Sequence, residues 1–231
     1  MKNKISVIIP AYFEEKSTIN TVNDLLNISK NIELLIVYKG EKYNYISEQL
    51  NKMCLDIKLI EVNGKSTRSI FMNIGAKQST GDILLFLHND TILPINYFEV
   101  LSILDLSKYN YGGFYKQFYP NNFFLALNST LTNIRLRLFG SLLGDNSIFI
   151  SSKLFKKIGG FADLSLMEDV EISKKLKKYG KIFIIKNKTI TSSKKFQKNG
   201  TIKTIIFMIY LRFLYLLGVD TKLLKEKYSK Y

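Results

Sequence analysis

Short runs of apolar residues, each of strand length, alternate along the first half of the chain with segments whose apolar residues recur at helical spacing. The runs occupy residues 5–9, 32–37, 57–62 and 83–87. Their hydrophobicity is continuous rather than alternating, which is typical of parallel strands covered by helices on both faces. This pattern predicts an α/β fold with an open, mostly parallel sheet flanked by helices.

Beyond residue 106 the pattern changes. Two adjacent glycines predict a bulged strand over residues 111–115, and a long apolar segment predicts a helix over residues 123–139. Further on, the sequence predicts a short strand at 147–151, a helix over 166–179 capped by Gly180, and a strand at 182–185.

An apolar, aromatic segment over residues 202–219 predicts a C-terminal helical segment. Lys203 and Arg212 interrupt it, so neither uninterrupted part approaches the ~20 apolar residues that a membrane span needs. Arg212 near the centre of a span would cost roughly 2.5–3.5 kcal/mol. Two interpretations stay open, a helix packed on the core and a helix lying on a membrane surface. Packing alone explains the apolar face of the segment, and lysines flank it: Lys194, Lys195, Lys198, Lys222, Lys225 and Lys227.

Composition limits the classes of function. The chain has 231 residues, only three prolines and no linker-like run, so we expect one domain over residues 1–231. A net charge of +15 indicates an anionic partner, such as phosphate-bearing substrates or an acidic membrane, or else an ordinary lysine-rich surface. The basic residues are dispersed and form no recognisable nucleic-acid motif, so nucleic acid is not expected.

The single cysteine, Cys54, excludes an internal disulfide framework and a thiol cluster for structural zinc. The chain enters its first predicted strand at residue 5 without a basic and then apolar leader, so we expect no secretory signal. Both observations fit a reducing cytoplasm.

The segments that follow the strands are the places to look for a ligand site, because ligands of an open parallel sheet bind outside the carboxyl ends of its strands. Pro10-Ala-Tyr-Phe-Glu-Glu follows the first strand and contains no glycine, which excludes a dinucleotide fingerprint and a P-loop there. Glu14 and Glu15 fit two interpretations. They are carboxylates favoured in the first turn of a helix, or they contact a nucleotide base or ribose.

His88, Asn89 and Asp90 follow the fourth strand. An aspartate in this place suits a divalent cation that is shared with a substrate diphosphate and keeps several waters. A loop-capping aspartate is the alternative, and the spacing does not decide between them.

Glu168 and Asp169 open the helix predicted over residues 166–179. Carboxylates are favoured at a helix start by the helix dipole, and they are also suited to general acid–base catalysis. The spacing of these two residues leaves both interpretations open.

Several short motifs, spread in order over nearly the whole chain, resemble glycosyltransferase family 2 on the GT-A fold. The resemblance extends to a bacterial subgroup whose metal motif reads Leu-Leu-Phe-Leu-His-Ala-Asp-Thr. The motifs lie at residues 7–10 with Glu14 and Glu15, at Arg68 with residues 72–76, at 81–91, at 144–145, at 159–161 and at 166–169.

The resemblance implies roles for individual residues. Asp90 would bind a metal ion and the donor diphosphate, with His88 in the place of the first acidic residue of an Asp-x-Asp motif. Asp169 would act as the general base, and Glu168 would position it. The implied substrate-binding residues are Pro10, Tyr12, Glu14, Tyr38, Arg68, Asn73, Asn89, Gly144 and Asp145.

The resemblance also implies an activity, inverting transfer of a sugar from a nucleotide sugar to an acceptor hydroxyl, assisted by Mn²⁺ or Mg²⁺. Residues 1–106 would form the nucleotide-sugar half, residues 107–200 the acceptor and catalytic half, and residues 201–231 the C-terminal segment. The acceptor would be a glycan, a lipid carrier or a small molecule. The expected location is the cytoplasm, with peripheral contact at the inner face of the plasma membrane.

Two departures from the family pattern affect nucleotide recognition. Val-Tyr38-Lys39-Gly stands where the family has an acidic residue, and Phe71 stands where it has glutamine. Tyr38 could stack on a base and Lys39 could meet a phosphate, or both could be surface replacements. The alternative function is therefore a catalytically altered or inactive binding protein on the same scaffold. A nucleotidyltransferase is less consistent with the sequence, because a glycine-rich basic loop is missing after the first strand.

Overall fold

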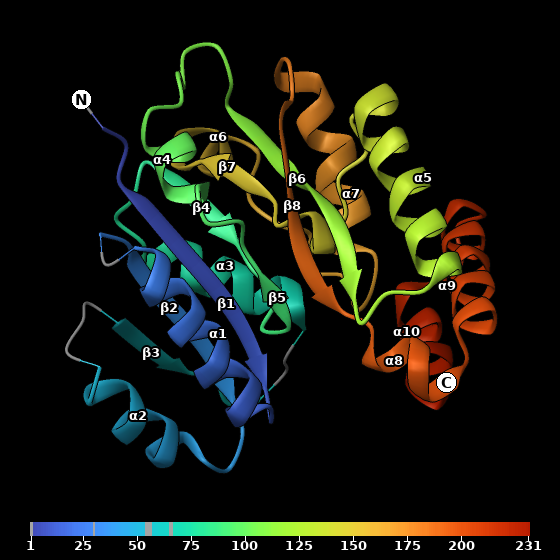
Figure 1. Ribbon diagram of the computed structural model, residues 1–231, viewed down its shortest axis with the longest axis horizontal. Coiled ribbons are helices and arrows are strands. Elements are labelled where there is room, and N and C mark those ends of the chain that lie inside the picture. The colour runs from blue at the N-terminus through green and yellow to red at the C-terminus, as the bar shows by residue number, and fades with distance from the viewer. Residues whose placement is uncertain (1, 30, 54–56, 65–66) are drawn as a thin grey trace.

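The computed structural model describes residues 2–29, 31–53, 57–64 and 67–231, so Cys54 lies outside the described residues. Within them, eight strands form one sheet in the order β3-β2-β1-β4-β7-β6-β8-β5 (Figure 1). In chain order the strands are β1 Ile5–Tyr12, β2 Glu33–Lys39, β3 Ile57–Glu61, β4 Ile83–Phe86, β5 Thr91–Ile92, β6 Tyr111–Tyr119, β7 Phe149–Ser151 and β8 Phe183–Ser192.

The sheet is parallel from β3 through β2 and β1 to β4, and β6 also pairs in parallel with β8. The pairings of β7 with β4 and β6, and of β5 with β8, are antiparallel. The predicted open, mostly parallel α/β sheet is therefore confirmed, and each antiparallel pairing involves β7 or β8, strands in the second half of the chain.

Helices cover both faces of the sheet. One core packs α1 (Glu15–Ile28), α2 (Tyr43–Asn51) and α4 (Tyr97–Ser102) against the sheet. The other core packs α3 (Arg68–Gln78), α5 (Phe123–Phe139), α6 (Ser152–Lys157) and α7 (Glu168–Leu176). Short 3-10 turns, η1 (Gly144–Asn146) and η2 (Lys177–Tyr179), precede β7 and follow α7.

The helix predicted over residues 123–139 is α5, with the same bounds. Asn122 caps its start by accepting a hydrogen bond from the Leu125 amide at 2.9 Å. Gly140 ends it in a left-handed conformation with φ of 58°. A polar cap, an apolar segment and a glycine stop are all local signals, which explains the agreement.

Three sequence predictions for the second half need correction. The strand predicted at 182–185 extends to Ser192, because its pairing with β6 continues past the lysines that interrupt the apolar pattern. The bulge of β6 lies between Phe114 and Tyr115 and not at the paired glycines. Gly112 is needed for a different reason, because a Cβ atom there would lie 1.9 Å from the Phe183 carbonyl oxygen on the neighbouring strand. Gly180 has φ of 116° and ψ of −162°, an extended conformation open only to glycine, rather than a left-handed cap.

The C-terminal segment consists of α8 (Lys194–Asn199), α9 (Thr201–Leu216) and α10 (Thr221–Lys230). Tyr231 joins them, because its ring stacks on Phe207 at 3.9 Å and its carbonyl oxygen accepts a hydrogen bond from Asn199. Among the described residues, no helix is long and apolar enough to cross a bilayer.

Candidate active site

Gly144 brings the two acidic motifs of the sequence into contact. Its amide donates a hydrogen bond of 2.8 Å to Asp169 Oδ2. A Cβ atom at this position would lie only 2.6 Å from Cε1 of His88, so the close approach of the imidazole depends on glycine. The segment after β4 and the start of α7 therefore meet at one place.

Asp169 lies half-buried in the first turn of α7. Its second carboxylate oxygen, Oδ1, accepts a hydrogen bond of 2.7 Å from the Val170 amide. Backbone groups from two different segments thus bind the two oxygens of this carboxylate. They fix its orientation and leave its remaining lone pairs available to a substrate.

Left-handed backbone conformations occur beside these residues. Among the described residues, the non-glycine positions with positive φ are Phe13 (47°), Ser147 (47°) and Met167 (69°). Phe13 follows β1, Ser147 follows η1, and Met167 directly precedes Glu168. Conformations of this kind cost free energy and concentrate at functional sites, which supports locating the site at this edge of the sheet.

Glu168 is 5% exposed and lies beside Arg68, with 3.5 Å between Oε1 and Nη1. Burial raises the pKa of the Glu168 carboxyl, and the positive charge of Arg68 opposes that rise. Because the Arg68 side chain is 46% exposed, solvent screens the pair, and it adds little to the stability of the fold.

His88 and Asp90 are two residues apart in the sequence but lie in different environments. Burial, reinforced by the charge of Arg68, lowers the pKa of His88 to about 3, so the imidazole is neutral near pH 7. Asp90 is exposed at the rim, where partial desolvation raises the pKa of its carboxyl against the effects of the Thr91 hydroxyl and Arg68. A neutral imidazole and a carboxylate are both competent metal ligands.

Asp145 forms a buried ion pair that the sequence did not indicate. Its Oδ2 pairs with Nζ of Lys116, a β6 side chain that is 4% exposed. Burial alone would raise the pKa of Asp145, but the charge of Lys116 and its hydrogen bond outweigh that effect and hold the pKa below its ordinary value. Asp145 Oδ1 has no hydrogen-bond partner among the described residues.

Glu14 and Asn89 connect the ends of β1 and β4. The Asn89 amide donates to Glu14 Oε2 at 2.7 Å, and the Asn89 carbonyl oxygen accepts hydrogen bonds from Ser17 and Thr21. The two predicted residues therefore lie together at the carboxyl edge of the parallel strands, where a donor would be expected.

Other predicted residues are committed to packing. Tyr38 is fully buried and donates to Glu15 Oε1 at 2.9 Å, so its ring offers no exposed face for a base. Asn73 exchanges two hydrogen bonds with the backbone of Phe161, which fixes the glycine turn before it. Pro10 is buried within β1.

Tyr12 stacks on Phe71 with 4.3 Å between ring centroids, so the replacement of the family glutamine has an aromatic partner. Burial raises the pKa of the Tyr12 hydroxyl, and this oxygen has no hydrogen-bond partner among the described residues.

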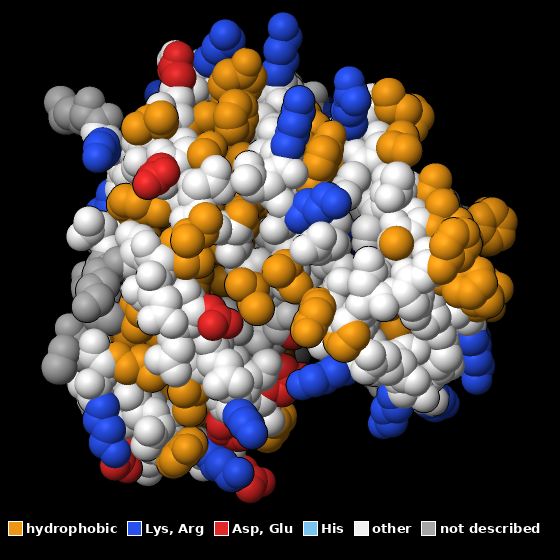
Figure 2. Space-filling model, viewed as in Figure 1, with side chains coloured by type: hydrophobic (Ala, Val, Ile, Leu, Met, Phe, Trp, Pro, Cys, Tyr) orange, Lys and Arg blue, Asp and Glu red, His pale blue; other side chains and the backbone are white. Residues whose placement is uncertain are grey.

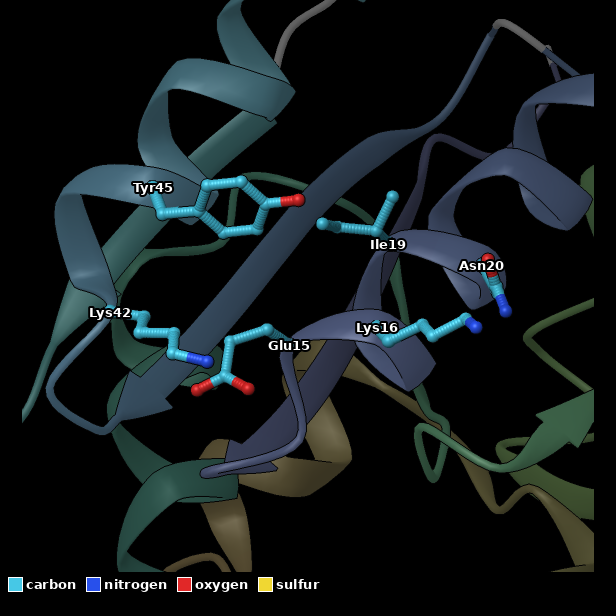
Figure 3. Close-up of a pocket in the computed structure, with 6 residues that line it drawn as sticks. All are labelled: Glu15, Lys16, Ile19, Asn20, Lys42 and Tyr45. Carbon is cyan, nitrogen blue, oxygen red and sulfur yellow. The ribbon is translucent and has the colours of Figure 1, made fainter.

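A groove of about 550 Å³ lies to one side, between the starts of α1 and α2. In Figure 3, the Glu15 carboxylate and the Lys42 ammonium point toward each other across it. Its volume falls in the range of small-ligand pockets, and of the residues singled out in the sequence Glu15 lines it, whereas His88, Asp90, Glu168 and Asp169 do not. The groove is therefore separate from the His88–Asp169 contact.

Comparison with known proteins identifies the class. Residues 6–149 match the family model described as glycosyl transferase family 2, and this stretch is more than half of the chain. The chain therefore belongs to glycosyltransferase family 2. No curated protein sequence matches it significantly.

Solved structures of the GT-A type share the fold. The mannosyltransferase PcManGT from Pyrobaculum calidifontis, in complex with GDP-Man and Mn²⁺, superimposes with a TM-score of 0.63 at 12% identity over 82% of this chain. S. aureus TarS 1–349 in complex with UDP gives a TM-score of 0.63 at 17% identity, also over 82% of this chain. The chain spans 57% and 60% of the lengths of those two proteins.

Proposed function

We propose that the protein is an inverting glycosyltransferase that moves a sugar from a nucleotide-sugar donor to an acceptor hydroxyl. The observation that carries this proposal is the contact made through Gly144, which lies against His88 and donates to Asp169. A donor-side residue and a carboxylate suited to take a proton are thereby held at one edge of the sheet. Membership of family 2 supports the reaction class.

In this proposal Asp169 is the general base. The acceptor oxygen attacks the anomeric carbon on the face opposite the leaving group as Asp169 takes the hydroxyl proton, and the bond to the nucleoside diphosphate breaks. Glu168 and Arg68 act as positioning residues, because their pair lies beside the base at the start of α7. Gly144 fixes the base by its amide hydrogen bond.

The residues present fit a divalent cation that is shared with the donor. The described residues contain no group of three His, Cys, Asp or Glu side chains placed to hold an ion by themselves. A cation bound mainly by substrate phosphates and water needs only one or two protein ligands, which Asp90 and the neutral His88 would provide. Mn²⁺ or Mg²⁺ bound there would stabilise charge on the departing diphosphate. The neighbour solved with GDP-Man and Mn²⁺ supports this assignment.

The donor would bind over the carboxyl ends of the parallel strands, in the half of the chain formed by residues 1–106. Glu14, Asn89 and Arg68 border that region. Pro10, Tyr12 and Asn73 would shape it through the backbone and packing rather than through free polar groups. Residues 107–200 would supply the acceptor side, and residues 201–231 would add peripheral contact with the inner face of a membrane.

A thermal-shift screen tests the proposal. The purified protein and its Asp90→Asn variant are compared with UDP-, GDP- and dTDP-sugars, each with and without Mn²⁺. A ligand at ~100 times its dissociation constant adds about 2.7 kcal/mol to stability, which is readily measured. We expect a shift that needs both the metal ion and Asp90.

A catalytically altered binding protein is the second candidate, favoured by the burial of Tyr38 and by Phe71 in place of the family glutamine. It predicts that no nucleotide sugar gives a metal-dependent shift. A shift of equal size in the Asp90→Asn variant would remove Asp90 from the donor site and with it the proposed mechanism.

A further inference from the structure

Two arginines on neighbouring helices bury donors that bind nothing. Nε and Nη2 of Arg135 on α5, and Nε of Arg212 on α9, are inaccessible to solvent and have no hydrogen-bond partner among the described residues. The two helices pack against each other beside β6 (Figure 1). Neither guanidinium lies within ion-pair distance of a carboxylate in the described part of the chain.

Hydrogen bonds attach both helices to the candidate site. On α5, Asn133 accepts from the Lys116 amide and donates to its carbonyl oxygen, each at 3.0 Å, and the Lys116 side chain pairs with Asp145. On α9, the Tyr215 hydroxyl donates to Glu171 on α7 at 2.7 Å. Because residues three apart share a helix face, Arg212 points to the same side as Tyr215.

Leaving these donors unbound is costly. A buried polar group without a partner loses its hydration and gains nothing in return, and two like charges add repulsion. Burial and then the charge of Arg212 lower the pKa of Arg135. The nearest negative charges, on Asp145 and Asp169, act on Arg135 only at a distance, and Asp145 already pairs with Lys116.

We propose that Arg135 and Arg212 together bind a phosphate group carried by the acceptor, whose hydroxyl then lies at Asp169. Guanidinium groups match phosphate oxygens in charge and in planar hydrogen-bond geometry, and two of them on separate helices surround one anion from two sides. This assignment rests on the proposed transferase function, and it names the chemical class of the acceptor.

The position separates this subsite from the donor. Arg68 is the arginine whose charge acts on both His88 and Asp90. Arg135 and Arg212 lie on α5 and α9, which pack against each other and contact β6 and α7, whereas the candidate donor residues Glu14 and Asn89 lie at the ends of β1 and β4. A phosphate there belongs to the molecule that presents the hydroxyl.

The test measures protection against thermal unfolding by glycerol 3-phosphate, with a chelator present to suppress metal-dependent binding. Arg135→Gln and Arg212→Gln should each weaken this binding by roughly 10- to 100-fold, because each removes charge-assisted hydrogen bonds to the anion. Arg137→Gln and Lys203→Gln are the matched controls, since they remove the same charge from exposed positions of the same helices. The controls should bind like the unchanged protein.

A lipid source of the phosphate is tested with phosphatidylcholine vesicles that contain either phosphatidic acid or phosphatidylglycerol at matched negative charge, so that general attraction to an anionic surface is the same in both. Loss of phosphatidic-acid-dependent binding in Arg135→Gln and Arg212→Gln, with no effect of the soluble phosphate, would assign the subsite to a lipid headgroup. Equal binding of both probes to all five proteins would overturn the subsite. The nucleotide-sugar shift, measured on the same proteins, tests the transferase function separately, because it depends on Asp90 and not on these arginines.

Discussion

A buried carboxylate in the parallel half of the sheet is fully paired, whereas two arginines on α5 and α9 bury donors without a partner in the described part of the chain. Glu33 in β2 is 2% exposed, and its carboxylate accepts hydrogen bonds from Ser6, Lys58 and the Thr80 amide at 2.5 to 2.7 Å. Arg135 and Arg212 bury donors that have no such partners in the described residues. The Glu33 carboxylate is fully paired as folded, whereas the two guanidinium groups have donors that a ligand would complete.

Apolar surface follows the same division. Val22 and Leu25 of α1 are buried, and the strands beneath are sealed on both faces. On α5 and α9 most large apolar side chains are exposed, and Figure 2 shows apolar atoms gathered over these helices at the right edge of the molecule. These exposed side chains are Phe123, Phe124, Leu127, Leu131, Ile134, Leu138 and Phe139 on α5, and Ile202, Ile206, Ile209, Tyr210, Phe213 and Leu216 on α9.

If the two regions serve different purposes, a change at the candidate site should affect activity without affecting stability, and this is the largest effect that we expect. Asp169→Asn should lower donor turnover by roughly 10²- to 10⁴-fold, the usual contribution of general base catalysis. Asparagine has one acceptor oxygen, which keeps the Gly144 hydrogen bond while the bond from the adjacent Val170 amide is lost, so the thermal midpoint should fall by only a few degrees. Release of nucleoside diphosphate from the donor found in the thermal-shift screen measures the effect.

Glu171→Gln is the control for Asp169→Asn, because it removes a carboxylate from the same helix, one that bonds to Tyr215 and Lys174 rather than to the groups around Gly144. Its turnover should change little. Full turnover in Asp169→Asn would remove this residue from the role of base.

The second prediction changes stability without changing function. Lys58, Ser6 and Thr80 outweigh burial and lower the pKa of Glu33 from 4.5 to about 2. A carboxyl whose pKa is lower in the folded protein than in the unfolded chain stabilises the fold. This stabilisation is fully present above the pKa of the unfolded chain, and it is lost as the pH falls through the pKa of the folded protein. Glu33→Gln should therefore cost about 3 kcal/mol near pH 7, and the difference should disappear between pH 4.5 and pH 2.

Urea unfolding at several pH values measures this loss. Glu48→Gln is the matched control, because Glu48 pairs with Lys52 on the surface of α2, where both side chains are more than 60% exposed. It should cost no more than about 0.5 kcal/mol at any pH. A pH-independent loss in Glu33→Gln would show that packing rather than charge accounts for the effect.

Sequence patterns predicted the first region better than the second, for a physical reason. Residues 5–9 and 83–87 form strands buried on both faces, so their apolar runs identify β1 and β4 directly. The continuation of β8 depends on pairing with β6, a contact between distant segments that leaves no local pattern.

The candidate site divides in the same way. His88, Asp90, Glu168 and Asp169 follow strands or open a helix, so their places in the sequence predicted them as candidates, and the structure brings the segments that carry them together. Arg212 was instead interpreted as an interruption of an apolar helix. No local pattern in the sequence marks Lys116 or Arg135, because only the packing of β6, α5 and α9 brings these charges near the candidate site.

The last and smallest effect concerns the exposed apolar surface of α9. We expect the protein to bind vesicles that contain anionic phosphatidylglycerol, with apolar side chains entering the headgroup region and nearby lysines meeting the charge. Ile206 is 62% exposed, so Ile206→Ser should leave stability within about 0.5 kcal/mol of the unchanged protein. Vesicle sedimentation should show binding weakened by roughly fivefold to twentyfold, because fully burying an isoleucine is worth roughly 1.5–3 kcal/mol and Ile206 has 62% of its surface left to bury.

Ile95→Ser is the control for Ile206→Ser, because Ile95 is 83% exposed but lies outside α5 and α9. It tests whether binding depends on the apolar surface of α9 or on any exposed apolar side chain. This variant should bind vesicles like the unchanged protein. High salt should weaken binding in every case, since mobile ions screen the attraction between lysines and headgroups. If Ile95→Ser and Ile206→Ser lost binding equally, the apolar surface of α9 would have no special role. Salt-resistant sedimentation would instead indicate insertion into the bilayer rather than peripheral contact.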